Sequence, residues 1–378
     1  MTLPLRALKP IILKELRQVR RDPTSLGMLM VLPAVLIIMV GYALNFDVKH
    51  TPLALYDQDR SPGSRSFLEK FKTTEYFDYC YEARGYADIE EEFLHGGAKI
   101  AVILPVSFAA NLAAGEDVHV QILVDGSDAN TAGQAVATAT RLTTDYSTHM
   151  VADAFALRGR SLPVPIDFQP RVWYNPDLIS SKFLVPGLIG FIIVLTAVIS
   201  TSLTVVREKE RGTMEQLMVS PLRPFEIILG KTIPYLGISM IAATAILILG
   251  YLLFDVQVRG SLLLLYAAIM MIILGGLGQG LLISTVTDSQ QVAFMISVFS
   301  SLLPSFLLSG FIFPVATMPL ALRVISNLAV NKFFLVVVRG VMLKGVGFTA
   351  VWEQFLFMFA FAAVMLGVSA KRMQKRSA

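Results

Sequence analysis

The sequence predicts a membrane α-helical bundle of six transmembrane helices with an inserted extracytoplasmic α/β domain. Hydrophobic residues make up 54% of the 378-residue chain, charged residues make up 16%, and the mean hydropathy is +0.63. This composition lies outside the range of soluble globular proteins. Several uncharged apolar blocks are long enough to cross a bilayer, which takes about 20 helical residues. One polar stretch, 45–182, is long enough to form a core of its own.

The predicted domains follow one another along the chain. Residues 1–25 form a cytoplasmic amphipathic helix, because apolar side chains recur at helical spacing between basic ones. Residues 26–44 form the first transmembrane helix. They follow a basic N-terminus, but they lack an A-x-A cleavage site, so we interpret them as an uncleaved helix and not as a secretory signal. The α/β domain occupies 45–182. Residues 183–378 hold the other five helices, in apolar blocks near 183–206, 232–254, 261–287, 289–322 and 354–370.

Basic residues predict the orientation of these helices. They are concentrated before the first helix, between the second and third, and at the C-terminus, whereas the opposite short loops hold few. Since cytoplasmic loops carry the excess of Lys and Arg, both termini are expected in the cytoplasm of a bacterial cell, and 45–182 outside it. The expected location is the inner membrane, with contact to membrane lipid. A net charge of +4 is explained by this asymmetry and predicts no nucleic-acid partner.

The external segment alternates strand-like and helix-like patterns. Strands are predicted at 53–56, 76–81, 100–104, 119–124 and 166–174, and helices at 62–72, 86–94 and 129–158. Cys80 is the only cysteine of the chain, so an intramolecular disulfide is impossible. The four histidines are scattered and no ligand spacing joins them, so no metal site is predicted.

The segment from Arg207 to Pro221 is the most informative part of the sequence. Glutamates alternate with Lys and Arg in it, although orientation in the membrane requires only the basic residues. Gly212 interrupts the helix, Thr213 and Gln216 have the spacing of a capping box, and Pro221 ends a short new helix. A short capped helix on charged arms suits contact with a soluble partner, but an ordinary charged loop explains the same residues equally well.

Motifs throughout the chain resemble those of the ABC-2 permeases, the membrane subunits of drug, antibiotic, polysaccharide and lipid exporters. The resemblance rests on Arg207-Glu-x-Glu-Arg-Gly-Thr-x-Glu-x-Leu, Lys14-Glu15-Leu16, Arg21-Asp22-Pro23, Tyr174-Asn175-Pro176 and Ser309-Gly310-Phe311-Ile312-Phe313-Pro314. The large insertion after the first helix is similar to that of multidrug-export permeases encoded in pairs. One departure is Val330, where relatives usually have proline.

The resemblance implies roles for two groups of residues. The cytoplasmic loop 207–231 would receive the motion of an ATPase through a coupling helix, with Glu208, Glu210, Arg211, Gly212, Thr213, Glu215 and Pro221 as its coupling residues. The N-terminal helix would be an elbow helix, marked by Lys14, Glu15, Arg21, Asp22 and Pro23. The implied partners are a cytoplasmic ABC ATPase, which holds ATP and Mg, a second identical or homologous permease forming a dimer, and a periplasmic adaptor. Gly230-Lys231-Thr232 lacks the glycine that a phosphate-binding loop needs at position 225, and the sequence has no Walker B, kinase or dinucleotide-binding pattern. We therefore expect that the chain binds no cofactor and is not itself an enzyme.

Two features of the apolar blocks bear on transport. None of the six apolar cores contains Asp, Glu, Lys, Arg or His, which argues against an ion-coupled carrier. The fifth helix is broken near its outer end, and broken backbone is tolerated in a membrane only beside protein or a water-filled cavity. We therefore expect a re-entrant outer gate within 304–345, formed by Ser309, Gly310, Phe311, Phe313 and Pro314, with the two phenylalanines as a plug and 324–343 as a helix at or outside the membrane surface.

The sequence thus favours an exporter permease for hydrophobic or amphipathic small molecules such as drugs or antibiotics. Export of lipid or polysaccharide is one alternative. Another is a membrane-anchored receptor or assembly factor that acts through its external domain, although one or two helices would suffice for anchoring. An intramembrane enzyme is disfavoured, because the sequence lacks a catalytic constellation.

Overall fold

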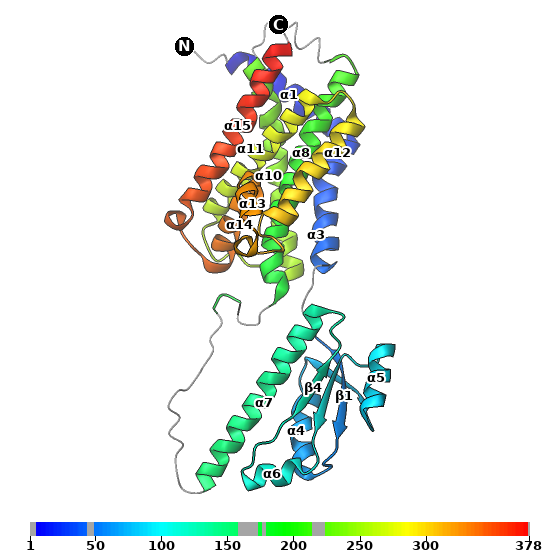
Figure 1. Cartoon of the computed structure of the whole chain (residues 1–378). Coiled ribbons are helices and arrows are strands. Elements are labelled where there is room, and N and C mark those ends of the chain that lie inside the picture. The colour runs from blue at the N-terminus through cyan, green and yellow to red at the C-terminus, as the bar shows by residue number, and fades with distance from the viewer. Residues whose placement is uncertain (1–4, 44–48, 158–172, 176–178, 214–223, 377–378) are drawn as a thin grey trace. The chain divides into compact units, whose positions relative to one another are not determined.

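The computed structural model describes residues 5–43, 49–157, 173–175, 179–213 and 224–376. The chain divides into two compact units. The helical unit comprises 1–45 and 171–378, and the second unit comprises 46–170. Figure 1 shows the helices of the first unit and the mixed helices and strands of the second.

The helical unit begins with a short N-terminal helix and continues through a series of long apolar helices. Its elements are α1 (Leu5–Arg21), α2 (Pro23–Leu26), the π-helix η1 (Gly27–Val31), α3 (Leu32–Ala43), α8 (Ser180–Glu210), α10 (Pro224–Phe254), α11 (Leu262–Val286), α12 (Gln290–Leu303), the π-helix η2 (Pro304–Leu308), the 3-10 turn η3 (Val315–Thr317), α13 (Leu320–Ile325), the 3-10 turn η4 (Ser326–Leu328), α14 (Val330–Arg339), the π-helix η5 (Gly340–Lys344), the 3-10 turn η6 (Phe348–Ala350) and α15 (Trp352–Arg376).

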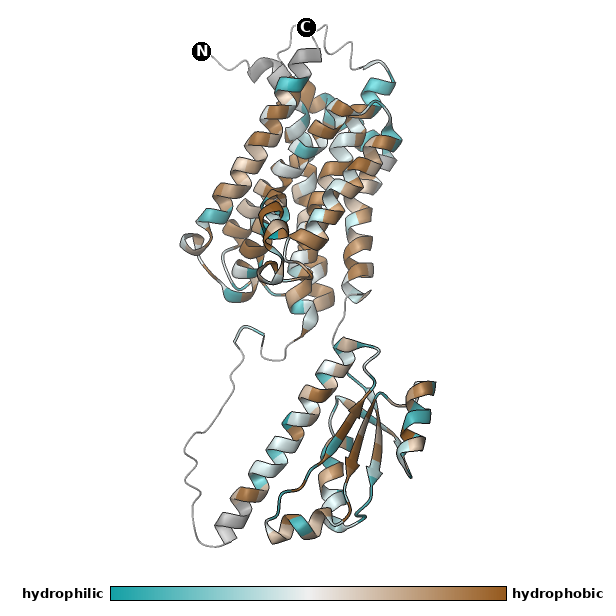
Figure 2. Cartoon of the chain, viewed as in Figure 1, coloured by the Kyte–Doolittle hydropathy of each residue, from teal (hydrophilic) through white to brown (hydrophobic). Residues whose placement is uncertain are grey.

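Five helices of the described chain are long and apolar enough to cross a membrane, and they lie in α8, α10, α11, α12 with η2, and α15. The apolar helix Gly27–Ala43 is shorter. A sixth span is reached if the bent pair Leu320–Leu328 and Val330–Lys344 is taken as one. Figure 2 shows hydrophobic residues along the middle of these helices. The prediction of a membrane helical bundle is therefore confirmed by the number, length and composition of these helices.

The helix α8 lies at the centre of the unit, as Figure 1 shows, and is almost completely buried within it. It contacts α3, α10, α11, α12 and α14. Glycines make its contact with α11 close: a Cβ at Gly276 would lie 3.0 Å from the Cβ of Ala197, and one at Gly280 would lie 2.6 Å from the carbonyl oxygen of Val198. The glycine-rich stretch of α11 therefore serves tight helix packing.

The segment after the fifth apolar block differs from the prediction. Instead of one surface helix over 324–343, the structure has a bend of 86° between η4 and α14, and α14 packs against α8, α11 and α15. The reason is the amphipathic pattern of α14, which buries Phe334, Leu335 and Val338 on one side. Backbone at the bend is extended at Ala329 (φ −85°, ψ 101°), which ends the preceding turn.

The second unit is built on a four-stranded sheet in the order β2-β1-β3-β4. Its strands are β1 (Thr51–Asp57), β2 (Phe77–Glu82), β3 (Ile100–Leu104) and β4 (Gln121–Val124), and its helices are α4 (Pro62–Lys72), α5 (Tyr86–His95), α6 (Phe108–Ala114) and α7 (Ala129–Leu157). The strand β1 is parallel to β2 and to β3, and β4 is antiparallel to β3. The predicted strand at 166–174 falls largely outside the described residues.

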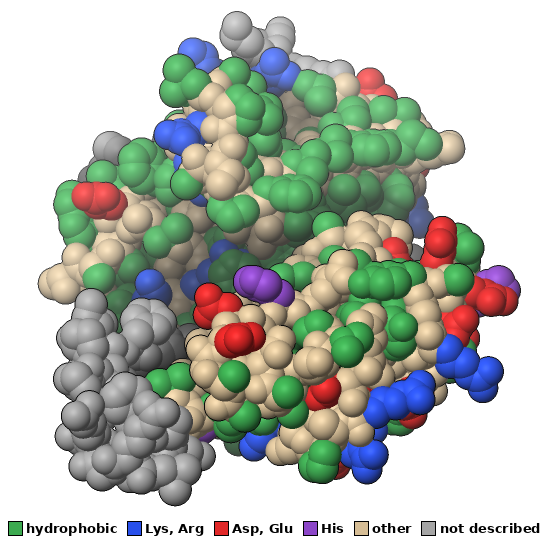
Figure 3. All heavy atoms as spheres, turned by 60° about the horizontal axis from the view of Figure 1, so that its bottom comes forward, with side chains coloured by type: hydrophobic (Ala, Val, Ile, Leu, Met, Phe, Trp, Pro, Cys, Tyr) green, Lys and Arg blue, Asp and Glu red, His purple; other side chains and the backbone are tan. Residues whose placement is uncertain are grey.

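Alternating side chains give the sheet a core on each face. Leu53 and Leu55 of β1 join Phe67 and Phe71 of α4 in one cluster. Ala54, between the two leucines, belongs to a second, smaller cluster with Ile89 of α5 on the opposite face. Figure 3 shows that Asp, Glu, Lys and Arg side chains are spread over the outside of this unit, where the histidines also lie. Cys80 is exposed.

Candidate functional site

Four charged side chains form a cluster that connects three elements of the helical unit. Glu208, near the end of α8, accepts hydrogen bonds from Lys14 of α1 at 2.7 Å and from Lys231 of α10 at 2.5 Å. Glu15 accepts from Lys231 at 3.1 Å and from Lys14 at 3.3 Å. We call these four residues the charge cluster. It joins α1 to the end of α8 and to the beginning of α10.

Three members of the charge cluster are buried. The exposed fractions are 0% for Glu15, 3% for Glu208 and 2% for Lys231, whereas the side chain of Lys14 is partly exposed. Removing such charges from water costs several kcal/mol per ion unless partners compensate. Burial lowers the pKa of Lys14, but its hydrogen bond to Glu208 and the nearby charge of Glu15 outweigh this effect, so the pKa lies above its ordinary value. The ammonium group is therefore charged at neutral pH.

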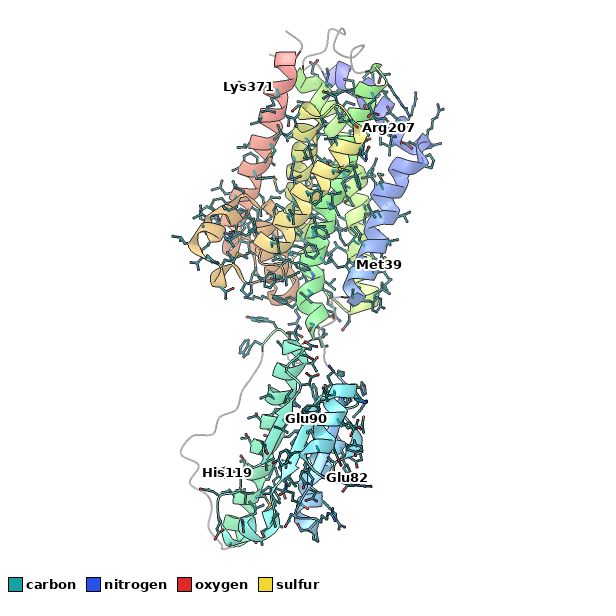
Figure 4. All side chains as sticks on the ribbon, turned by 45° about the vertical axis from the view of Figure 1, so that its right-hand side comes forward. Met39, Glu82, Glu90, His119, Arg207 and Lys371 are labelled. Atoms are coloured by element: carbon teal, nitrogen blue, oxygen red, sulfur yellow. The ribbon has the colours of Figure 1, made fainter. Side chains whose placement is uncertain are left out.

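Further polar contacts at this end of the unit join α8 to its neighbours. Arg207 pairs with Asp22, directly after α1, and donates to Gln290 of α12 at 3.2 Å. Lys209 donates to the carbonyl of Thr287 at 3.0 Å, and Glu210 accepts from the backbone N–H of Gln290 at 2.8 Å. Figure 4 shows Arg207 at the same end of the helical unit as Lys371 of α15, and Met39 of α3 nearer the other end.

The structure locates most of the predicted coupling residues at this end. Glu208 and Glu210 lie in the last turn of α8, which ends at Glu210. Arg211 is exposed, and the backbone of Gly212 is left-handed, with φ +70°. The hydroxyl of Thr213 donates to the carbonyl of Glu208 at 3.2 Å. Glu215 and Pro221, and with them the predicted coupling helix, lie outside the described residues. Roles in coupling therefore remain predictions for all seven.

The segment predicted to be an elbow helix forms the helix α1, which ends at Arg21, and its role as an elbow stays a prediction. Lys14 and Glu15 belong to the charge cluster, and Asp22 pairs with Arg207. Arg21 and Pro23 are exposed. Sequence reasoning singled out Lys14, Glu15 and Glu208 but did not bring them together. It considered Lys231 for membrane orientation, for the resemblance of the cytoplasmic loop and for a phosphate-binding pattern, but not as an ion-pair partner of Glu208. The sequence did contain one sign of such a pair. Glu208 lies just after the apolar block near 183–206, and Lys231 lies just before the block near 232–254.

The predicted outer gate residues lie on the loop that follows η2. Arg339 of α14 binds this loop: its guanidinium donates to the carbonyls of Gly310 and Phe311 at 3.2 and 3.3 Å, and to that of Phe183 in α8 at 3.3 Å. The guanidinium also lies 3.6 Å from the centre of the Phe183 ring, which is a cation–π contact. Sequence analysis missed Arg339, because its partners are backbone groups.

The two phenylalanines of the predicted plug have different environments. Phe311 is fully buried and its ring lies 5.3 Å from that of Phe306, whereas the side chain of Phe313 is 55% exposed. Ser309 is buried, with its hydroxyl donating to the carbonyl of Ser305, and Pro314 is exposed. Phe311 is thus a core residue, whereas the side chain of Phe313 is exposed. A gating role for this loop stays a prediction.

Several apolar helices of membrane-spanning length define a multi-pass membrane protein, and its charge cluster joins the N-terminal helix α1 to the ends of two of the long helices. Among the described residues no group of three or more His, Cys, Asp or Glu is placed to hold a metal ion. The family model for ABC-2 family transporter proteins matches residues 24–371, so the chain belongs to this family.

Relatives with curated names agree with this assignment. The probable multidrug ABC transporter permease YbhS of Escherichia coli K12 is 30% identical over 376 residues, covering 98% of this chain and 97% of the relative. The probable multidrug ABC transporter permease YbhR is 30% identical over 343 residues, or 91% of each chain. The inner membrane transport permease YhhJ is 23% identical over 96% of each chain. The chain is an ABC transporter permease.

Proposed function

We propose that the chain is the membrane-spanning subunit of an ATP-driven exporter. It moves hydrophobic or amphipathic small molecules, such as drugs or antibiotics, out across the inner membrane and depends on a separate ATPase chain. The names of the multidrug permease relatives support the class of cargo. In this proposal both termini are cytoplasmic, unit 46–170 is extracytoplasmic, and two permeases associate as a dimer.

The charge cluster is the observation that carries the proposal. Glu208 lies just before the segment 214–223, and Lys231 lies just after it, so the cluster joins the two helices that flank this segment. Lys14 and Glu15 connect both helices to α1. A partner that moves the segment would therefore move α1, α8 and α10 together, because breaking a buried ion pair is costly. Transport follows if this motion shifts the bundle between inward-open and outward-open states.

Copurification tests the proposal. Tagged protein, solubilised from its native host in mild detergent, should retain a soluble P-loop ATPase in stoichiometric amount. The variant Glu215→Lys should insert into the membrane normally but lose the ATPase, whereas Arg372→Glu, a charge reversal in the exposed part of α15, should retain it. An ATPase-free preparation in several detergents would contradict the proposal.

Transport is then measured with proteoliposomes that contain the permease and the copurified ATPase. Accumulation of an amphipathic fluorescent dye should require ATP and should be lost in Glu208→Ala, with membrane insertion unchanged. If the wild type hydrolyses ATP without moving the dye, the proposed class of cargo is wrong. If it neither hydrolyses ATP nor moves the dye, the copurified protein is not the ATPase partner.

A further inference from the structure

The bent pair Leu320–Leu328 and Val330–Lys344 carries basic residues but no acidic one. Its four cations are Arg323, Lys332, Arg339 and Lys344. The sequence has no Asp or Glu from 289 to 352, so a stretch that includes the whole bent pair lacks a counter-charge of its own. Figure 1 shows α13 and α14 away from the end of the helical unit at which the C-terminus lies.

Within the described part of the chain, none of these four cations pairs with a carboxylate. Arg323 donates to the carbonyl of Ala316 at 2.6 Å. Lys332 donates to the hydroxyl of Ser326 at 2.9 Å and to Oδ1 of Asn327 at 2.7 Å. Carbonyl, hydroxyl and amide oxygens are neutral acceptors, so both side chains keep a positive charge that an anion can compensate.

The opposite end of the helical unit treats its cations differently. There Lys14 and Lys231 pair with Glu208, and Arg207 pairs with Asp22. The chain thus compensates these cations at one end and leaves those of the bent pair without a carboxylate at the other. Basic residues next to a membrane-spanning helix are attracted to anionic lipid headgroups, which supply the missing charge.

The helix α13 and the turn η4 add an exposed apolar surface to the same segment. Five of their large apolar side chains are exposed, namely Leu320 (76%), Leu322 (43%), Val324 (62%), Ile325 (47%) and Leu328 (75%). At 3.6 residues per turn, those of α13 cover more than half of the circumference of the helix. A docked protein would bury one side of such a helix, whereas lipid tails can surround it.

We propose that Leu320–Leu328 lies at the headgroup level of the bilayer and that Arg323 and Lys332 bind the phosphate groups of anionic phospholipid. The apolar side chains of the segment contact the acyl chains, while the two long basic side chains reach the headgroups. An anionic lipid such as phosphatidylglycerol is preferred, because a zwitterionic headgroup brings a cation of its own. The inference requires only that the chain spans a membrane, so it is independent of the proposed cargo, ATPase and orientation.

The test measures which lipid lies next to α13 in the purified full-length chain. In a Cys80→Ser background, Leu320→Cys places a fluorophore at an exposed position of α13. The protein is reconstituted in nanodiscs of phosphatidylcholine and phosphatidylglycerol, in which one of the two lipids carries a doxyl quencher on its acyl chain. At equal mole fraction, labelled phosphatidylglycerol should quench the fluorophore more strongly than labelled phosphatidylcholine.

Substitution of the two cations decides whether they cause this preference. Arg323→Gln and Lys332→Gln should each lower the association constant of phosphatidylglycerol, relative to phosphatidylcholine, about fivefold, the effect of one basic residue at an anionic surface. Arg323→Lys conserves the charge and should keep the preference. Lys70→Gln, an equal change of charge on the exposed side of α4 in the second unit, should behave as the wild type. If Lys332→Gln does not fold, Arg323→Gln still decides, because it leaves the hydrogen bonds of Lys332 intact.

Equal quenching by the two labelled lipids in the wild type would overturn the proposal, and so would a preference that both Gln variants retain. Quenching by neither lipid would overturn it as well, and would mean that protein or water covers α13. Inorganic phosphate should weaken the preference no more than sodium chloride of equal ionic strength, because it brings no acyl chain. If phosphate alone abolishes the preference, the two cations bind a free anion and lipid is not their partner.

Discussion

A buried carboxylate such as Glu208 needs cations in direct contact, because the loss of hydration costs several kcal/mol per ion. Lys14 and Lys231 supply them, from helices that are remote in sequence. Lys231 has no room for hydration, since it is 2% exposed and lies between Glu208 and Glu15. The charge cluster is therefore a unit in which each ion depends on the others.

Removal of Lys231 alone should destabilise the helical unit strongly. Lys231→Met leaves Glu15 with only the partly exposed Lys14, and breaking a buried pair typically costs about 3–5 kcal/mol. Reversible unfolding in mixed detergent micelles measures this free energy. Lys371→Met, an exposed substitution at the same end, should change it by less than about 0.5 kcal/mol.

The double variant Glu15→Gln with Lys231→Met distinguishes this explanation from simple loss of packing. It removes the uncompensated negative charge together with Lys231, so it should regain part of the stability that Lys231→Met loses. If the double variant is as unstable as the sum of its two single variants, the electrostatic account of the cluster is wrong.

Asp125, after β4, gives the second unit a dependence on pH. Its carboxylate accepts the backbone N–H of Ser127 at 2.9 Å and then an ion pair from Lys99 at 3.2 Å, and these contacts lower its pKa from 3.8 to about 2. A carboxyl group with a lowered folded pKa stabilises the folded state above its unfolded pKa. That contribution should be fully present above pH 4 and lost as the pH falls through about 2.

Hydrogen exchange of the strands β1, β3 and β4, followed between pH 5 and pH 2 in the full-length chain, checks this dependence. Protection, corrected for intrinsic exchange, should fall with pH in the wild type and fall less steeply in Asp125→Asn. The control is Asp117→Asn, an exposed acidic substitution before β4, which should leave the pH profile unchanged. Identical profiles for the wild type and Asp125→Asn would contradict the role of Asp125.

At the scale of elements, the central position of α8 depends on glycines of α11. A Cβ at Gly280 would lie 2.6 Å from the carbonyl oxygen of Val198 and 3.0 Å from the Cβ of Thr201. Because that carbonyl is part of a helix backbone, the two helices would have to separate. Gly280→Ala should therefore lower the free energy of unfolding by about 1–3 kcal/mol.

Gly367 of α15 is the matched control, since a Cβ there meets no atom within 4 Å. Gly367→Ala should stabilise its helix by up to about 1 kcal/mol, through helix propensity alone. Thermal unfolding of both variants in detergent gives the comparison. Equal effects from the two substitutions would mean that close approach of α8 and α11 does not limit stability.

The elements were predictable where one sequence pattern decides the structure. The short apolar run from Leu53 and the apolar run from Ile100 indicated the strands β1 and β3 correctly. The bend at Ala329 was not predictable, because apolar periodicity does not show whether a helix lies on the bundle or enters it. Arg339 is a similar case: its partners are the carbonyls of Phe183, Gly310 and Phe311, which no side-chain pattern reveals.

At the scale of the whole molecule, the apolar blocks were sufficient to predict a membrane helical bundle, and the resemblance of the motifs to those of ABC-2 permeases predicted the family. They were not sufficient to find the charge cluster, which brings together residues 194 positions apart, Lys14 and Glu208. Composition thus predicts the environment of a chain, whereas the sites within it depend on packing.

Orientation in the membrane is the remaining property of the whole molecule, and the chain offers a direct test. Cys80 is exposed on the second unit, so an impermeant maleimide should label it in intact spheroplasts if that unit is extracytoplasmic. In a Cys80→Ser background, Lys371→Cys, on the exposed side of α15, should react only after the membrane is permeabilised. Labelling of Lys371→Cys in intact spheroplasts would reverse the predicted orientation, and the charge cluster would then face away from any cytoplasmic ATPase.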